Sequence, residues 1–190
     1  SALFAAGPGR DRVDRLVLYA PIFAERNEPW LDLVADPADR ARPNPALGAF
    51  RRVGRADLLA RWDGDIPGPD KDAWRAEAVL DAILADAIAA DPASDGASFR
   101  VPNGALVDLC DAFNGRPLYD PAALSLPVLL VRGEADTTSS HSDATRLFER
   151  LSSPIKRLLV IGGGAHFLPA ERNAWQAQAA IGDFLCGPLA

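Results

Sequence analysis

The sequence predicts an α/β fold in which three parallel strands with flanking helices are interrupted by an all-helical block. Two observations predict it. From residue 123 to the end, short apolar runs alternate with amphipathic segments, which is typical of parallel strands joined by right-handed crossovers. A similar apolar run lies near the start, at residues 16–20, and residues 23–118 show helical spacing without a convincing strand pattern.

The first part of the predicted core comprises residues 1–22. Residues 1–6 (SALFAA) resemble the second half of a helix that ends at Gly7, because glycine followed by proline is a typical helix stop. Residues 16–20 (LVLYA) form a short apolar run closed by a proline, as expected of a buried parallel strand. A helix that lacks its first half indicates a chain cut in mid-helix.

The block of residues 23–122 is expected to be helical throughout. An Asn-Pro pair at residues 44–45 is a good cap and first turn, and it predicts a long helix with a bend near Gly54. Asp70 is expected to cap a second long helix, whose apolar residues recur at helical spacing until an Asp-Pro pair ends it. A shorter helix is expected at residues 103–113.

Residues 123–190 form the second part of the predicted core. Apolar runs at residues 128–131 and 158–161 predict two buried strands with a helix between them, and a final helix is expected at residues 171–185. Three parallel strands would leave one strand edge unpaired. We therefore expect further strands of the sheet in residues that precede Ser1.

Composition excludes several classes of protein. The 190 residues carry a formal charge of −6, with 48% hydrophobic and 24% charged residues, which is ordinary for a folded globular protein. The arginines are scattered among acids and form no basic field for nucleic acid. No apolar stretch approaches the roughly 20 residues that span a bilayer, and the N-terminus lacks the pattern of a secretory leader.

We expect a cytoplasmic protein without metal or cofactor. The cysteines, Cys110 and Cys186, form neither a disulfide framework nor a metal-binding spacing. The glycines at residues 162–164 lack the lysine of a P-loop and the later glycines of a dinucleotide fingerprint. This glycine run predicts a flexible approach to His166 instead.

Asp136 and His166 are the candidate catalytic residues. Each follows an apolar run that breaks at glycine, so each is expected on a loop just beyond the carboxyl end of a strand, where α/β sheets keep their chemistry. The 30 residues between them leave room for one crossover, so the two side chains can lie at the same end of neighbouring strands. A carboxylate and an imidazole placed there are the orienting and proton-shuttling parts of a nucleophilic triad.

Each candidate also has a plainer interpretation. Asp136 alone fits a turn or helix-capping aspartate, and His166 alone fits a loop histidine bonded to the backbone. Their joint spacing, with a glycine-rich approach to the histidine and Glu171 soon after it, favours the catalytic interpretation. The other histidine, His141, fits a polar segment that caps a helix.

Three segments resemble those of the α/β-hydrolases. Residues 12–21 (RVDRLVLYAP) resemble the segment after the nucleophile helix, and residues 126–136 (LPVLLVRGEAD) resemble the strand and turn that carry the acid. Residues 162–172 (GGGAHFLPAER) are similar to the histidine loop and the helix after it. The resemblance covers residues 1–21 and 124–190, and the block between them lies where family members carry a helical cap.

The resemblance gives Asp136 and His166 the acid and histidine roles of a triad. The family's nucleophile elbow, G-x-S-x-G, and its oxyanion loop occur nowhere in these residues. The nucleophile is therefore expected a few residues before Ser1, and the segment that carries it is a partner needed to complete the fold.

The function implied is that of a serine hydrolase that acts on a small-molecule carboxylic ester, with lipid-like esters as one substrate class. A thioesterase or carbon–carbon bond hydrolase on the same scaffold is an alternative, because one triad serves many leaving groups. An aspartate nucleophile would give dehalogenase or epoxide-hydrolase chemistry, and a non-catalytic ligand-binding relative is a third interpretation. Trp62 and Trp74 fit core packing by their helical spacing, with an acyl pocket in the cap as the alternative.

Overall fold

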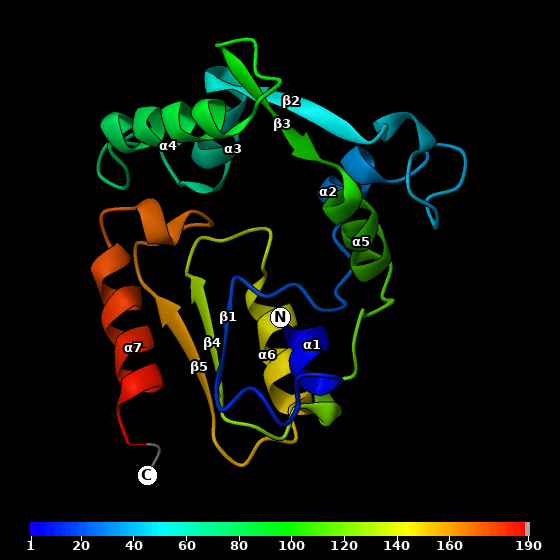
Figure 1. The fold of residues 1–190 in the computed structure, drawn as a ribbon, viewed down its shortest axis with the longest axis vertical. Helices are drawn as coiled ribbons and strands as arrows, with labels where there is room; N and C mark the ends of the chain where they lie inside the picture. The colour runs from blue at the N-terminus through cyan, green and yellow to red at the C-terminus, as the bar shows by residue number, and fades with distance from the viewer. Residues whose placement is uncertain (189–190) are drawn as a thin grey trace.

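The computed structural model describes residues 1–188 and contains a parallel sheet with the strand order β1–β4–β5 (Figure 1). The strands are β1 (Leu16–Tyr19), β4 (Val128–Gly133) and β5 (Lys156–Ile161). β4 is paired with a parallel neighbour on each side. The carboxyl ends of all three strands therefore meet at one edge, and the predicted α/β fold is confirmed.

Helices cover both faces of this sheet (Figure 1). On one face, α1 (Ala2–Ala6) and α6 (His141–Arg150) pack with the sheet in one apolar cluster. On the other face, α7 (Ala174–Cys186) packs in a second cluster, through Ala177 and Phe184. Because it is covered on both sides, β4 is buried along its whole length, which explains the apolar run at residues 128–131.

The 23–122 block contains a two-stranded antiparallel ribbon, so the prediction that it is all-helical is wrong on this point. The long helix expected from residue 44 is interrupted by β2, and Gly54, where a bend was expected, is the N-cap of α3. Asp70 caps only a turn, through the N–H of Ala73. The helix predicted at residues 103–113 is confirmed as α5. The elements of the block, with the 3-10 turn that follows it, are α2 (Glu28–Val34), η1 (Pro45–Leu47), β2 (Phe50–Gly54), α3 (Arg55–Asp65), α4 (Glu77–Ala90), β3 (Ser98–Pro102), α5 (Gly104–Phe113) and η2 (Pro121–Ala123).

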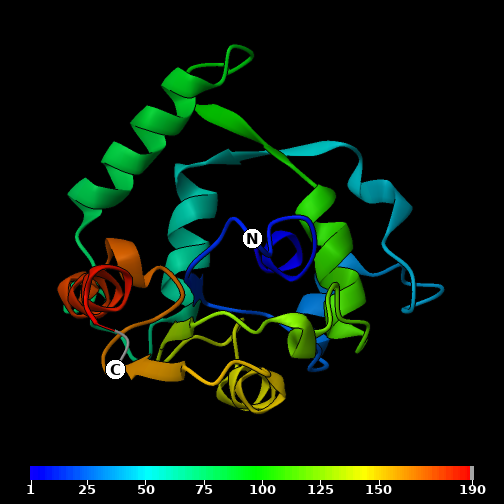
Figure 2. The ribbon, with the colours of Figure 1, turned by 60° about the horizontal axis from the view of Figure 1, so that its bottom comes forward.

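The ribbon joins two helix pairs, α2 with α5 and α3 with α4 (Figure 1, Figure 2). Each pair has its own apolar cluster. The cluster of α3 and α4 also contains Ala165 and Phe167, which lie in the loop after β5. The α3–α4 pair therefore lies over the carboxyl ends of the strands. Among the helices of residues 1–188, none combines the length and the apolar character that crossing a membrane requires.

Candidate active site

Asp136 lies in a tight turn directly after β4 and is 3% exposed. Its Oδ1 accepts hydrogen bonds from the backbone N–H groups of Thr138 and Ser139, each at 2.9 Å. Arg132, the next-to-last residue of β4, donates to the carbonyl oxygens of Asp136 and Ser139, each at 2.7 Å. Burial lowers the pKa of the Arg132 guanidinium. These bonds fix the turn and leave Oδ2 of Asp136 as the oxygen directed at the next loop.

The structure brings His166 to that oxygen. The Nδ1 atom of His166 lies 2.9 Å from Oδ2 of Asp136, and the imidazole keeps 24% of its side-chain surface exposed while the carboxylate has none. A buried carboxylate bound to one ring nitrogen fixes the tautomer of the ring and orients it. The two predicted site residues are thus in contact, and their catalytic role stays a prediction.

The half-buried Tyr19 and the buried Glu171 hold the loop that carries His166. The hydroxyl of Tyr19, at the end of β1, donates to the backbone carbonyl of His166. Burial and the nearby charges of Asp136 and Glu171 raise the pKa of Tyr19, so it remains a protonated donor. The carboxylate of Glu171 accepts from the N–H of Ala165 at 2.6 Å, and burial raises the pKa of Glu171.

The glycine run before His166 allows a close approach between two loops, and the flexibility predicted for this run stays a prediction. Gly164 lies against Gly133, the last residue of β4, and the carbonyl of Gly164 accepts from the N–H of Ala135 at 2.9 Å. A Cβ on Gly133 would lie 2.4 Å from the carbonyl oxygens of both Gly164 and Ala165. Residues 134–140, the acid turn, carry Asp136, and residues 162–167, the histidine loop, carry His166. Only glycine at residue 133 lets these two segments come this close.

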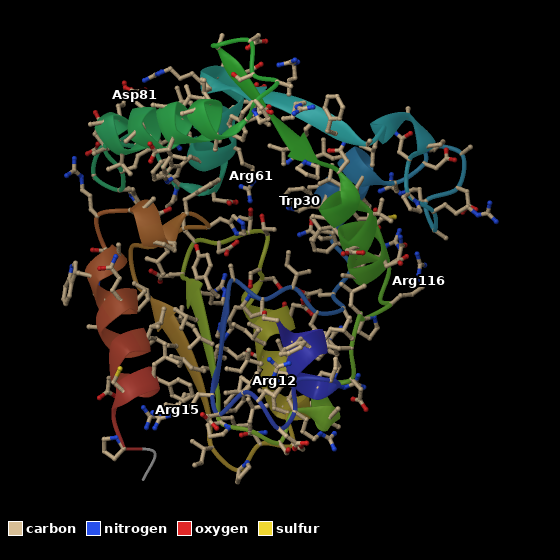
Figure 3. All side chains as sticks on the ribbon, in the orientation of Figure 1. Arg12, Arg15, Trp30, Arg61, Asp81 and Arg116 are labelled. Atoms are coloured by element: carbon tan, nitrogen blue, oxygen red, sulfur yellow. The ribbon has the colours of Figure 1, made fainter. Side chains whose placement is uncertain are left out.

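The 23–122 block adds a second carboxylate to the site. Asp65, at the end of α3, is buried and accepts a hydrogen bond from the hydroxyl of Thr137, in the acid turn. Arg61, one helical turn earlier, donates from Nη1 to Asp65 at 2.5 Å and from Nη2 to Oγ1 of Thr138 at 2.6 Å. Figure 3 shows Arg61 beside Trp30, over which its guanidinium lies at 5.3 Å from the ring centroid.

Asp65, Asp136 and His166 form a group that could present ligand atoms to a metal ion, all within 4.8 Å of one another. Both oxygens of each carboxylate already accept hydrogen bonds, and the Arg61 guanidinium lies against Asp65. A cation there would displace these bonds and face a fixed positive charge. The arrangement is that of a hydrogen-bond network.

His141 and Trp62 lie where their plainer interpretations, helix capping and core packing, predict. His141 is exposed at the first position of α6, whose N-cap is Ser140. Trp62 is 2% exposed and packs in the core of the α3–α4 pair, with its Nε1 donating to Glu171 at 3.2 Å. A groove of about 510 Å³ lies between α4 and the ribbon, and its lining includes none of the site residues described above.

Sequence reasoning did not assign roles to Tyr19, Arg61, Asp65 and Arg132. A signal existed for Arg132, because an arginine inside an apolar strand run has to find buried acceptors. Arg61 and Asp65 stand four residues apart on a helix, and such a pair reads as an ordinary surface ion pair. The pair belongs to the site only because α3 packs over the acid turn.

Comparison with known families gives one match, which covers most of the chain. The family model described as "Serine aminopeptidase, S33" matches residues 2–173. Among curated proteins, no sequence matches this one.

Solved structures match nearly the whole chain. The monoacylglycerol lipase of Paleococcus ferrophilus is 17% identical with a TM-score of 0.55, over 97% of this chain and 63% of that chain. E-2-(acetamidomethylene)succinate hydrolase is 19% identical with a TM-score of 0.56, over 97% and 62%. A soluble variant of monoglyceride lipase from Saccharomyces cerevisiae is 15% identical with a TM-score of 0.54, over 97% and 59%. The chain thus spans about three fifths of the length of these structures.

Proposed function

The chain belongs to the S33 serine aminopeptidase family and has the α/β-hydrolase fold, and on this premise we propose that it carries the acid and the histidine of a serine hydrolase. The proposed reaction is the cleavage of a small carboxylic ester. The nucleophilic serine comes, in this proposal, from outside residues 1–190, because no G-x-S-x-G elbow occurs within them.

The hydrogen bond between Asp136 and His166 is the observation that carries the proposal. With Nδ1 bonded to the carboxylate, Nε2 is the ring atom left to take the proton of a serine hydroxyl as its oxygen attacks the ester carbonyl. His166 then returns that proton to the leaving alkoxide, and water releases the acyl group in a second passage of the same steps. Asp136 stabilises the imidazolium that forms in each passage.

Aromatic side chains beside His166 support an apolar, lipid-like ester as substrate. Phe167 lies edge-on to the imidazole with 5.7 Å between the ring centroids, and Trp62 lies 5.3 Å from Phe167. Phe167 is half-buried and offers apolar surface close to the reacting atoms, and the buried Trp62 packs against it. Two of the structural matches are monoacylglycerol or monoglyceride lipases, and the proposal takes its substrate class from them.

We assign the 23–122 block to a cap that sets substrate choice, on a core of residues 1–22 and 123–190. The position of α3 over the strand ends supports this division. Thioesters and carbon–carbon bonds stay open as alternative substrates, because the same triad serves them. Both cysteines of the described residues are unpaired, which supports a reducing cytoplasmic location.

We also propose that the preceding segment of the protein completes the sheet. Within residues 1–188, β1 pairs only with β4, so its other edge is free. In α1, Leu3 and Phe4 are 62% and 44% exposed. A strand added beside β1, and a longer α1, would cover these groups.

The test uses the complete protein with an activated ester and a fluorophosphonate probe. His166→Ala removes the general base, so we expect the acylation rate to fall by about 10²–10⁴-fold. Asp136→Asn is also expected to be severe, because an amide can hold the imidazole in the wrong tautomer while the fold stays intact. Both variants are expected to unfold cooperatively, with midpoints close to that of the wild type.

His141→Ala is the matched control, since this histidine is exposed and lies at the start of α6. We expect it to keep the wild-type rate and probe labelling. Near-wild-type rates in folded His166→Ala and Asp136→Asn would show that the triad assignment is wrong. The non-catalytic ligand-binding interpretation would then be the better one.

A further inference from the structure

Thr138 connects the acid to the cap through two different parts of one residue. Its backbone N–H donates to Oδ1 of Asp136 at 2.9 Å. Its hydroxyl oxygen accepts from Nε1 of Trp30 at 3.1 Å and from Nη2 of Arg61 at 2.6 Å. Trp30 belongs to α2 and Arg61 to α3, so both helix pairs of the cap meet at this hydroxyl.

Arg61 contacts the cap and both site loops. Its guanidinium donates to Asp65 at 2.5 Å and lies over the rings of Trp30 and Phe167, at 5.3 and 5.6 Å from their centroids. Phe167 is the residue after His166, so Arg61 contacts the histidine loop as well as the acid turn. A guanidinium can do this because its donors spread in one plane and its face stacks on aromatic rings.

The hydroxyl of Thr138 uses both of its acceptor positions in these two bonds. The side chain is 4% exposed, so water does not readily replace either donor. Any shift of α2 or α3 therefore pulls on the residue whose N–H orients Asp136. A misplacement of about 1 Å in a catalytic group can cost about 10²-fold in rate.

We propose that Thr138 and Arg61 are positioning residues that couple the placement of the cap helices to the orientation of Asp136. This inference rests on the proposed function. It implies that a substrate which moves the cap changes the rate of proton transfer at His166, and not only the affinity of the site.

Thr138→Val in the complete protein is the first test. Valine keeps the shape and the backbone N–H and removes the hydroxyl acceptor. We expect kcat to fall by about tenfold or more with KM changed by less than about twofold, because the change acts on the orientation of the acid. Thr138→Ser, which retains the hydroxyl, is expected to restore most of kcat.

The matched control is Arg52→Ala, which removes an exposed arginine of β2 that bonds to Asp95, far from the site. It is expected to leave kcat and KM unchanged. Arg61→Lys is the second variant and serves if Thr138→Val fails to fold. Lysine keeps the charge but cannot hold two acceptors in one plane, so the same loss of kcat is expected.

An independent readout is the NMR resonance of the Nδ1 proton of His166, which a bond to a buried carboxylate moves downfield. The resonance is assigned by its absence in His166→Ala. We expect it to broaden or shift in Thr138→Val and Arg61→Lys and to stay in place in Arg52→Ala. Because this signal needs no turnover, it reports the coupling even where the wild type fails to hydrolyse esters and the proposed function is lost.

Wild-type kcat in both folded site variants would overturn the coupling. An unchanged Nδ1 resonance in both would overturn it as well. A loss of kcat in Thr138→Val that Thr138→Ser does not restore would show that packing, and not the hydroxyl, matters at this residue.

Discussion

Replacing Gly133 by alanine tests whether the close approach of two loops sets the geometry of the site. The added Cβ would lie 2.4 Å from the carbonyl oxygens of Gly164 and Ala165, and 2.5 Å from the carbonyl carbon of Gly164. Non-bonded heavy atoms of this kind settle at about 3.5 Å. The histidine loop therefore has to move away from β4 by about 1 Å, because all three of these atoms are backbone.

This displacement acts directly on the bond between Asp136 and His166. The bond is 2.9 Å long, so a loop shift of about 1 Å extends it past 3.6 Å, at which distance it is no longer a hydrogen bond. We expect kcat/KM of Gly133→Ala to fall by about 10²-fold. We also expect the free energy of unfolding to fall by about 1–3 kcal/mol, which is typical of overpacking.

The assay is hydrolysis of an activated ester by the complete protein, together with urea unfolding. Gly182→Ala is the matched control, because Gly182 lies in α7 and a Cβ there meets no atom within 4 Å. This variant is expected to keep full activity and to gain about 0.5–1 kcal/mol of stability. Wild-type kcat/KM in a folded Gly133→Ala variant would refute the reasoning, because it would show that the loops tolerate the separation.

Three further predictions follow from buried groups and exposed edges. Arg132→Met leaves two buried carbonyls without donors and should lower the free energy of unfolding by about 2–5 kcal/mol in urea titrations; a loss below about 1 kcal/mol would contradict this. Burial raises the pKa of Glu171, so the folded state keeps its proton to higher pH than the unfolded state does. The stability of the wild type relative to Glu171→Gln should therefore fall as pH rises above 4.5, and a difference that is constant with pH would be evidence against it. Residues 1–190 expressed alone should aggregate, because the edge of β1 is free, and co-expression of the preceding segment should rescue them; a cooperative transition from a soluble monomer would contradict this.

The sheet was predictable because its central strand is buried on both faces. Such strands read as unbroken apolar runs, and residues 128–131 are the clearest case. The ribbon was not predictable in the same way. β2 has two arginines at its centre and is exposed at three of its five positions, so its sequence lacks the apolar run that a buried strand shows. Its partner β3 lies more than 40 residues further along the chain, and no local sequence pattern predicts that pairing.

The contact between Asp136 and His166 was predictable because both residues follow strands at a glycine. Their supporting groups depend on contacts between distant segments. Asp65 accepts a hydrogen bond from Thr137, which lies 72 residues further along the chain, and Tyr19 reaches a loop that lies 147 residues further along. The contact of Gly164 with Gly133 in the preceding strand was not predictable for the same reason.

The pairing of β1 with β4 has a consequence for how the protein folds and how it can change. Leu16 is paired with Val128, so the whole 23–122 block lies in one loop of more than 100 residues between two adjacent strands. The entropy of closing such a loop grows only with the logarithm of its length, about 0.6 kcal/mol per doubling. Insertions in the 23–122 block therefore cost the strand pair little stability, and the length of this block is free to diverge. The pairing of β1 with β4 requires contact between segments that are far apart in the sequence, which makes it a slow step in folding.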